Sequence, residues 1–277
     1  MNCIFCKSDS RESRSVEHVI PESLGNTEHI LPPGVVCDRC NNYFACKVEG
    51  PLLADPFFRD LCFRTAIPSK KGRAPRVRGI HMQSRVEVEL SREPDGSGVG
   101  VGAAFEKDER RWIESVRSST TGKLTIPIPT APDQRLMSRF LAKVALECLA
   151  LRLVDIEGGI DEIITKSALD PVRDYARKGG TKLTWPFHTR ALYPPDFTFA
   201  ESGQEPYQVL HEWTLLYPRK TMLYLVIAIS GVEYALNLGA PEIETYKSWL
   251  VDNSGQSPLY PGAMNTCEIV SPIDHER

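Results

Sequence analysis

The sequence contains no run approaching eighteen consecutive apolar residues, the length typical of a membrane-spanning helix. Its first fifteen residues, MNCIFCKSDSRESRS, are too polar and too rich in cysteine for a secretory signal. The chain also has no internal repeat, no low-complexity tract and no recognisable nucleophilic serine motif. These absences predict a cytoplasmic protein that makes no contact with a membrane.

The composition is that of an ordinary folded protein. Of its 277 residues, 42% are apolar and 25% are charged, which suits one large domain or two modest ones. The formal net charge of -3 argues against a protein that coats nucleic acid through bulk electrostatics.

The charge is unevenly distributed along the chain. Residues 1–80 contain twelve Lys and Arg against nine Asp and Glu, whereas the remainder contains 21 against 27. Five cations fall within nine residues, a density that suits phosphate contacts or, equally, a solvated linker. They are Lys70, Lys71, Arg73, Arg76 and Arg78.

Four of the eight cysteines form two CxxC pairs separated by thirty residues. They are Cys3, Cys6, Cys37 and Cys40, whereas Cys46, Cys62, Cys148 and Cys267 are scattered singly. Two such tight turns, or knuckles, have the spacing that closes a tetrahedral thiolate site around zinc. Cytosolic proteins seldom keep structural disulfides, so we predict a structural zinc ion; the alternative is four unrelated thiols.

The segment between and after the knuckles predicts a short strand followed by a helix. Residues 15–20 can form the strand, and a loop broken by proline leads to the second knuckle. Residues 41–49 contain no Gly or Pro and can form a brief helix, which we expect Pro51 to stop after Gly50.

Residues 67–79 have the composition of a linker, with two prolines, two glycines and five cations. We therefore predict a module at 1–66, a basic linker at 67–80 and a second region at 81–277. Residues 85–90 alternate polar and apolar and predict a half-buried strand. The four glycines in residues 93–102 predict a turn.

The second region has the pattern of an α+β domain. Apolar residues recur in pairs from Leu136 to Leu149, which predicts an amphipathic helix that follows Pro132. Its expected solvent face carries Arg135, Arg139, Lys143, Glu147 and Arg152. A second helix is predicted from Asp170 to Gly179, and residues 222–229 and 234–238 predict a buried hairpin with a turn at Gly231.

The N-terminal segment offers the groups that phosphodiester hydrolysis requires. His18 follows a carboxylate in a strand-like setting, and a neutral imidazole near pH 7 is well matched to take a proton from water. The oxygens of Glu17 and of the Asn41 carboxamide suit Mg²⁺ or Mn²⁺. Because Asn41 follows Cys40 directly, the zinc ion would fix its position.

Four motifs together resemble the HNH, or ββα-metal, endonucleases, in the four-cysteine branch with EH-x-x-P and CxxCN signatures. They are Cys3-x2-Cys6, Glu17-His18-Val19-Ile20-Pro21, Gly25-Asn26 and Cys37-x2-Cys40-Asn41-Asn42. The resemblance covers residues 1 to about 65. It implies a small zinc-stapled ββα-metal nuclease module followed by a larger α+β domain.

The resemblance also implies roles for particular residues. His18 corresponds to the general base, Glu17 and Asn41 to the ligands of a catalytic divalent metal, and Asn26 to the residue that orients the histidine loop. In many relatives the middle asparagine lies just ahead of the second knuckle, where this chain has residues 33–36. Asn42 can exchange roles with Asn41, and Glu49 and His29 are additional candidates near the site.

Three other features favour structural interpretations. His188 and His211 lie beside aromatic residues and are expected to be structural histidines. The glycines of residues 98–102 lack a following helix pattern or lysine, which argues against a phosphate-binding loop.

The leading hypothesis is a metal-dependent endonuclease that cuts double-stranded DNA. By analogy alone, such a protein would serve bacterial restriction or anti-phage defence. The acidic second region would then serve targeting, self-association or binding of a regulatory partner. It resembles the accessory region often fused to such modules, on residues 140–143 and 173–179. The alternatives are a non-catalytic zinc-containing DNA-binding or adaptor protein, and a nuclease that its second region inhibits until a ligand or oligomerisation releases it.

Overall fold

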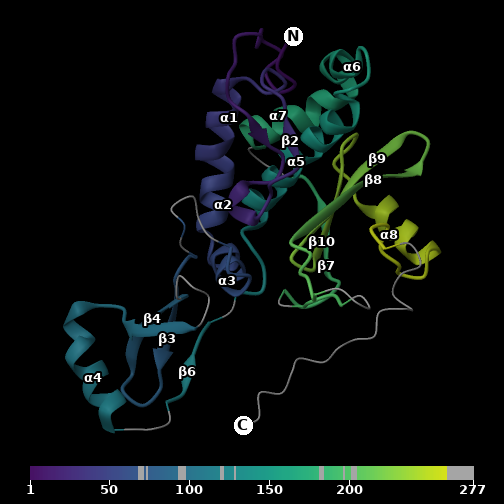
Figure 1. Ribbon diagram of the computed structural model, residues 1–277. Helices are drawn as coiled ribbons and strands as arrows, with labels where there is room; N and C mark the ends of the chain where they lie inside the picture. The colour runs from purple at the N-terminus through teal and green to yellow at the C-terminus, as the bar shows by residue number, and fades with distance from the viewer. Residues whose placement is uncertain are drawn as a thin grey trace.

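The computed structural model describes residues 1–67, 72, 74–92, 98–118, 122–127, 129–180, 184–195, 197–200 and 205–260. Helices and strands are mixed, which confirms the predicted α+β class. Figure 1 shows an upper body that contains the N-terminal segment, several helices and a sheet, with a smaller β-rich lobe to one side. Among the described residues, no helix is both long and apolar enough to cross a membrane.

The N-terminal segment folds as a short hairpin followed by helices. Its elements are β1 (Glu17–His18), a 3₁₀ turn (Glu22–Leu24), β2 (Ile30–Leu31), α1 (Asp38–Phe44), a π-helical turn (Ala45–Glu49), α2 (Gly50–Ala54) and α3 (Pro56–Arg64). In the antiparallel pair, Glu17 lies opposite Leu31 and His18 lies opposite Ile30. The strand predicted at residues 15–20 is therefore present but shorter.

The prediction that Pro51 ends the helix is wrong, because helical backbone continues from Asp38 to Ala54. The π-helical turn explains the difference: the Gly50 N–H donates to the carbonyl of Ala45, five residues back. This wider turn lies directly ahead of Pro51, which has no N–H to donate. The proline therefore occupies the first turn of α2 without breaking the helix.

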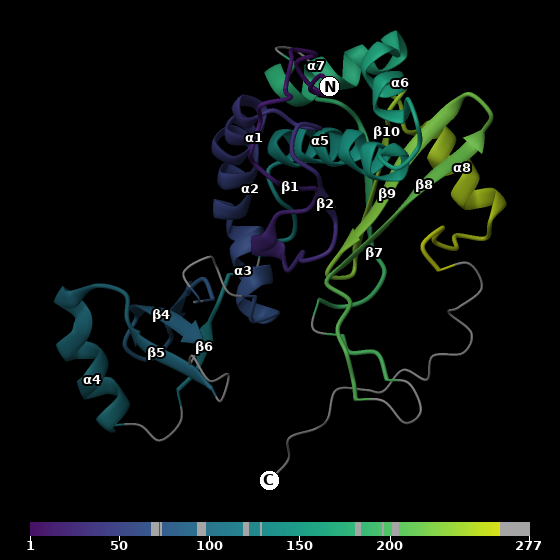
Figure 2. The ribbon, with the colours of Figure 1, turned by 45° about the horizontal axis from the view of Figure 1, so that its top comes forward.

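The β-rich lobe is a four-stranded antiparallel sheet with strand order β5-β4-β3-β6. Its elements are β3 (Val77–His81), β4 (Val86–Arg92), β5 (Val99–Ala103), a 3₁₀ turn (Glu106–Asp108), α4 (Glu109–Ser118) and β6 (Leu124–Thr125). Phe63 of α3 and Trp112 of α4 pack against its buried valines. Figure 2 shows α4 at the outer side of this lobe.

The structure differs from two expectations in this lobe at particular residues. Strand β3 begins at Val77, inside the range predicted as linker, and it alternates buried and exposed residues. Of the turn expected at residues 93–102, residues 93–97 lie outside the described residues, and Gly100 and Gly102 lie in β5, a strand at the edge of the sheet. The strand expected at residues 85–90 is confirmed as β4.

The predicted basic cluster is only partly described, because Lys70, Lys71 and Arg73 lie outside the described residues. Arg76 contacts Glu89 at 2.6 Å and Arg78 contacts Glu87 at 3.2 Å, both across the β3–β4 pair. These two arginines therefore form ion pairs with neighbouring carboxylates of the same sheet.

The rest of the chain supplies three helices, a second sheet and a covering helix. The elements are α5 (Gln134–Leu153), α6 (Gly159–Thr165), a 3₁₀ turn (Ser167–Leu169), α7 (Asp170–Lys178), β7 (Phe187–Ala191), β8 (His211–Arg219), β9 (Met222–Ile229), β10 (Val232–Asn237) and α8 (Glu244–Asp252). The strand order is β7-β10-β9-β8, all antiparallel. The predicted hairpin is confirmed as β9–β10, with Ser230 and Gly231 at positive φ in its turn.

Helix α5 lies between the N-terminal hairpin and the second sheet, with α8 on the other side of that sheet (Figure 2). One hydrophobic core runs continuously from the N-terminal segment through α5 and α7 to β9 and β10. Asp133 caps α5 by accepting from the N–H groups of Arg135 and Leu136.

The predicted solvent face of α5 is wrong at two positions. Lys143 and Glu147 are fully buried, because the N-terminal hairpin covers the side of the helix that faces away from the sheet. Apart from Lys143 and Glu147, nearly all positions between Met137 and Ala150 are apolar, a pattern typical of a helix that is buried on all sides. Charged residues within such a pattern must find partners inside the protein.

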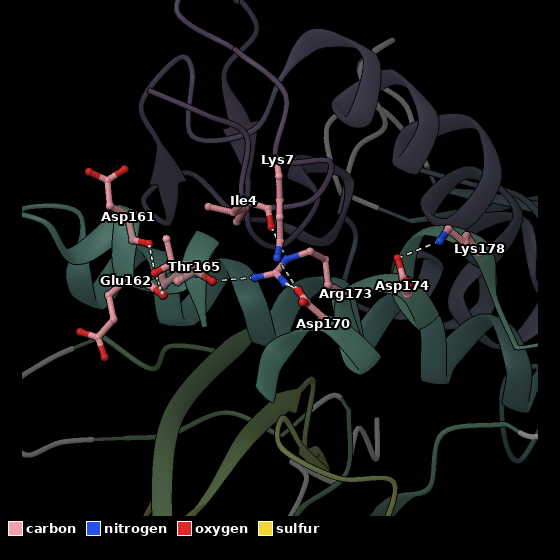
Figure 3. Close-up of polar contacts among 10 residues, drawn as sticks. Ile4, Lys7, Asp161, Glu162, Thr165, Asp170, Arg173, Asp174 and Lys178 are labelled. Atoms are coloured by element: carbon pink, nitrogen blue, oxygen red, sulfur yellow. Dashed lines mark hydrogen bonds and ion pairs between the residues drawn. The ribbon is translucent and has the colours of Figure 1, made fainter. Parts of the chain in front are cut away.

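Helix α7 is joined to the first knuckle through Arg173, which is only 2% exposed. Its Nε donates to the carbonyl of Ile4 at 2.6 Å, and its Nη2 donates to the carbonyl of Ile163 at 2.6 Å. Figure 3 shows the guanidinium between Ile4 and Asp170, with which it also pairs. Lys7 contacts the same Asp170 carboxylate at 2.6 Å.

Substitution Arg173→Met is expected to lower the free energy of unfolding by about 2–4 kcal/mol, because two buried carbonyls lose their donor. Chemical denaturation measures this loss. The matched control is Lys178→Met on the same helix, which removes an exposed pair with Asp174 at 3.0 Å and should leave stability nearly unchanged. Equal effects of the two substitutions would contradict the structural role of Arg173.

Candidate nuclease and metal centre

The two CxxC pairs come together as one thiol cluster. The Sγ atoms of all four residues lie within 4.8 Å of one another, and those of Cys6 and Cys37 are 3.6 Å apart. The residues are Cys3, Cys6, Cys37 and Cys40. Sulfur atoms in a tetrahedral zinc site are about 3.8 Å apart, given Zn–S bonds of about 2.3 Å. The donor set and its spacing therefore fit a structural zinc ion.

Hydrogen bonds favour the thiolate form of Cys3 within this cluster, whereas burial raises the pKa of Cys37. Cys3 Sγ accepts from the N–H groups of Phe5, at 3.4 Å, and Cys37, at 3.3 Å. The hydrogen bond from Cys40, together with backbone N–H groups and against the effect of burial, lowers the pKa of Cys3 to about 4. Thiolate is the form of cysteine that binds zinc. All seven cysteines among the described residues are free thiols.

The second knuckle places Asn41 relative to β1. Cys37 precedes α1 and Cys40 lies in its first turn, so Asn41 lies on the helix beside the strand. Its Nδ2 donates to the Val16 carbonyl at 3.1 Å, and its carbonyl oxygen remains as a candidate metal ligand. The neighbouring Asn42 is exposed, and its Oδ1 accepts from the Cys46 thiol.

Asn26 holds the loop between β1 and β2 from within. The side chain is fully buried and its Nδ2 donates to the carbonyls of Ile20, at 2.7 Å, and His29, at 3.0 Å. Its Oδ1 accepts from the N–H groups of Glu28, at 3.1 Å, and His29, at 2.9 Å. The same loop is tied to the strand because the Val19 N–H donates to the His29 carbonyl at 3.0 Å. This geometry suits a residue that orients the histidine loop.

Four of the candidate residues line one pocket of about 220 Å³ between β1 and the α1–α2 helix. They are Glu17, His18, Asn41 and Glu49. Two buried atoms of these residues, Glu17 Oε2 and His18 Nδ1, have neither a hydrogen bond nor an ion pair among the described residues, whereas the buried Glu49 Oε1 pairs with Lys143. A carboxylate oxygen and an imidazole nitrogen thus share the pocket with the Asn41 amide. The carboxylate oxygen of Glu17 and the amide oxygen of Asn41 fit a hard divalent cation such as Mg²⁺ or Mn²⁺.

Glu49 reaches this pocket from the π-helical turn. That turn rotates the following residues relative to an α-helix, and such turns occur frequently at functional sites. The Glu49 side chain is 15% exposed. Its carboxylate and that of Glu17 both form ion pairs with Lys143 of α5. Sequence reasoning noted Glu49 as a candidate, but the π-helical turn has no sequence signal strong enough to predict.

The residue that sequence reasoning missed is Lys143 of α5. Its Nζ lies 2.6 Å from Glu17 Oε1, 2.6 Å from Glu49 Oε1 and 2.8 Å from Glu147 Oε2. It also donates to the carbonyl of His18, at 3.2 Å, and to that of the next residue, at 3.4 Å. The side chains of Lys143 and Glu147 are fully buried. A cation from the second region therefore lies directly behind the Glu17–His18 pair.

The three carboxylates keep this lysine charged. Burial by itself lowers the pKa of Lys143, but attraction to Glu147, Glu17 and Glu49 reverses the effect and raises it well above its usual value. Burial raises the pKa of Glu147 and, less strongly, that of Glu17, and attraction to Lys143 opposes both shifts. The ammonium group is thus a fixed positive charge within an acidic cluster.

The other histidines within the described residues do not line this pocket. His188 makes an edge contact with Tyr246, with ring centroids 5.5 Å apart, and burial lowers its pKa. His211 contacts His29 at a centroid distance of 5.6 Å, in a separate hollow that Trp213 also lines. Their structural roles remain predictions.

With this geometry in place, the N-terminal module can be assigned. Residues 3–56 match the family model of the HNH endonucleases, which confirms the resemblance predicted from the motifs. The matched segment begins at the first zinc-site cysteine and ends where α3 starts. No curated protein and no solved structure matches the chain. Residues 3–56 are therefore similar to a family of nucleases, enzymes whose substrate is nucleic acid.

Substitution Cys37→Ser is expected to remove zinc and destabilise the module, because Cys37 joins the knuckles and borders core residues. Elemental analysis should find one zinc ion per chain in the wild type. It should find much less in the variant, together with a lower melting temperature. The control is Cys46→Ser, an exposed thiol outside the cluster, which should keep its zinc. Full zinc content in Cys37→Ser would refute the four-thiolate site.

Proposed function

We propose that this protein is a metal-dependent endonuclease that hydrolyses phosphodiester bonds in DNA, with the active centre in its N-terminal module. The observation that carries the proposal is the shared pocket of Glu17, His18 and Asn41 beside the four-cysteine cluster. The match of residues 3–56 to the HNH endonucleases supports the same class of chemistry.

In this proposal His18 is the general base. Its imidazole takes a proton from a water molecule, which then attacks the phosphorus. The β1–β2 pairing and the Asn26 hydrogen bonds fix the backbone on both sides of His18, so the imidazole approaches the substrate in one orientation. Asn26 acts through the loop and does not touch the substrate.

Glu17 and Asn41 would hold the catalytic metal through Oε2 and the amide oxygen. When bound, Mg²⁺ or Mn²⁺ neutralises charge on the scissile phosphate and stabilises the leaving oxygen. Lys143 pairs with Oε1 of Glu17, whereas Oε2 has no hydrogen-bond partner among the described residues and would be the oxygen that holds the metal. The zinc-bound knuckle would keep Asn41 opposite it.

A second candidate is a zinc-containing protein that binds DNA without cutting it. The observation that favours it is the 2.6 Å contact between Lys143 and Glu17, since a cation already satisfies one oxygen of the predicted metal ligand. The two candidates differ in the effect of Glu17→Ala. That substitution abolishes cutting if the protein is a nuclease, and it leaves DNA binding unchanged if the protein only binds.

Substitution His18→Ala is expected to reduce the rate of DNA cleavage by about 10²–10⁴-fold, because a general base contributes that much. Plasmid nicking with Mg²⁺ and with Mn²⁺ measures it. Zinc content and melting temperature should stay near those of the wild type, which separates lost chemistry from lost folding. Identical background nicking by wild type and variant under every metal tried would exclude the proposed reaction.

Adjacent asparagines provide a matched pair for the metal ligand. Asn41→Ala removes one oxygen ligand, so we expect Mn²⁺ binding to weaken and cleavage to slow, each by about tenfold or more. Asn42→Ala should change neither, because that side chain is exposed beside Cys46. Titration of Mn²⁺ followed by electron paramagnetic resonance checks the binding. If Asn42→Ala has the larger effect, the two residues exchange roles.

A further inference from the structure

The Lys143 ammonium joins the pocket to the second region of the chain. Two of its three carboxylate partners, Glu17 and Glu49, line the pocket, whereas Glu147 lies behind it on α5 itself. Hydrogen bonds to two consecutive carbonyls of β1 hold the same ammonium against the strand. Apart from the pair with Glu147, the contacts of Lys143 described above are therefore to the strand or to a carboxylate of the pocket.

The contact has a directional consequence for Glu17. Oε1 faces Lys143 at 2.6 Å, and Oε2 has no hydrogen-bond partner among the described residues. Glu17 is 5% exposed, so water cannot replace the lysine freely. The ammonium therefore selects one rotamer of the carboxylate and leaves one oxygen for a ligand in the pocket.

Lys143 also sets the net charge around the pocket. Without Lys143, two pocket carboxylates and the buried Glu147 would lie together with no cation, an arrangement that attracts divalent metal ions strongly. One fixed positive charge beside Glu17 and Glu49 repels an incoming cation and reduces the number that the pocket can hold. Divalent cations normally favour sites with several carboxylates.

We propose that Lys143 is a positioning residue of the nuclease centre, supplied in cis by α5, that aims the free oxygen of Glu17 and restricts the pocket to a single divalent metal. This inference rests on the proposed function. It also makes the module depend on the second region, since the cation that organises its active site is outside residues 1–66.

The test uses the full-length, zinc-loaded protein and Mn²⁺ as the probe. Lys143→Met keeps the length of the side chain and removes the charge. Lys143→Arg keeps the charge and changes the geometry. The double variant Lys143→Met with Glu147→Gln removes a cation and an anion together, which protects the fold if the single variant is unstable. Mn²⁺ is suited to oxygen ligands and does not compete well for thiolates.

For Lys143→Met we expect Mn²⁺ to bind about tenfold or more tightly, with more than one ion per chain, because a repelling charge is gone. We also expect kcat for DNA cleavage to fall by about 10²-fold with KM little changed, since Glu17 is no longer aimed. Lys143→Arg should keep Mn²⁺ affinity and recover part of kcat. The double variant should melt near the wild type and cleave slowly.

A merely structural lysine would give a different pattern, in which metal affinity, kcat and melting temperature all fall together. That pattern in Lys143→Met, or wild-type kcat in the folded double variant, would overturn the inference. Wild-type protein that binds Mn²⁺ but cuts no DNA would refute the proposed function instead. In that case the rise or fall of Mn²⁺ affinity in Lys143→Met still decides the role of the lysine.

Discussion

The buried ammonium of Lys143 is the contact on which the arrangement of the site depends. It lies within 2.8 Å of three carboxylates and within hydrogen-bonding reach of β1, and its side chain is fully buried. An unpaired lysine or carboxylate at this depth would cost several kcal/mol, so neither side can move without the other. The hairpin that presents Glu17 and His18 is consequently fixed to α5.

Two further cations of the second region reinforce this connection. Arg173 donates to the carbonyl of Ile4 in the first knuckle, and Arg139 donates to the hydroxyl of Tyr43 on α1 at 2.8 Å. Together with the continuous hydrophobic core, these contacts make the nuclease module and helices α5 and α7 one packed unit. Targeting or regulation by the second region would act on the active centre through these contacts.

Two groups of residues fix different parts of the module: the four-cysteine cluster, and Lys143 with its three carboxylate partners. Four thiolates fix the knuckles and, through Cys40, the start of the helix that carries Asn41. Lys143 and the Asn26 hydrogen bonds fix the strand and loop that carry Glu17 and His18. A zinc ion held by the four cysteines would therefore stabilise the frame, and the chemistry proposed for the pocket uses oxygen and nitrogen donors. The π-helical turn brings Glu49 between these two clusters.

The sequence by itself determined the resemblance of the N-terminal module to the HNH endonucleases and its four-cysteine cluster, because these signals are local. The CxxC spacing, the Glu17–His18 pair and the asparagine after Cys40 lie within a few residues of their motifs, and the β9–β10 hairpin follows from a short turn. It did not determine the partner of Glu17, because Lys143 lies more than a hundred residues away and a charged residue on a helix is ordinarily expected to face solvent. Only the tertiary structure decided that α5 is covered on both sides, which is the physical reason why Lys143 becomes a buried counter-charge within the proposed active site.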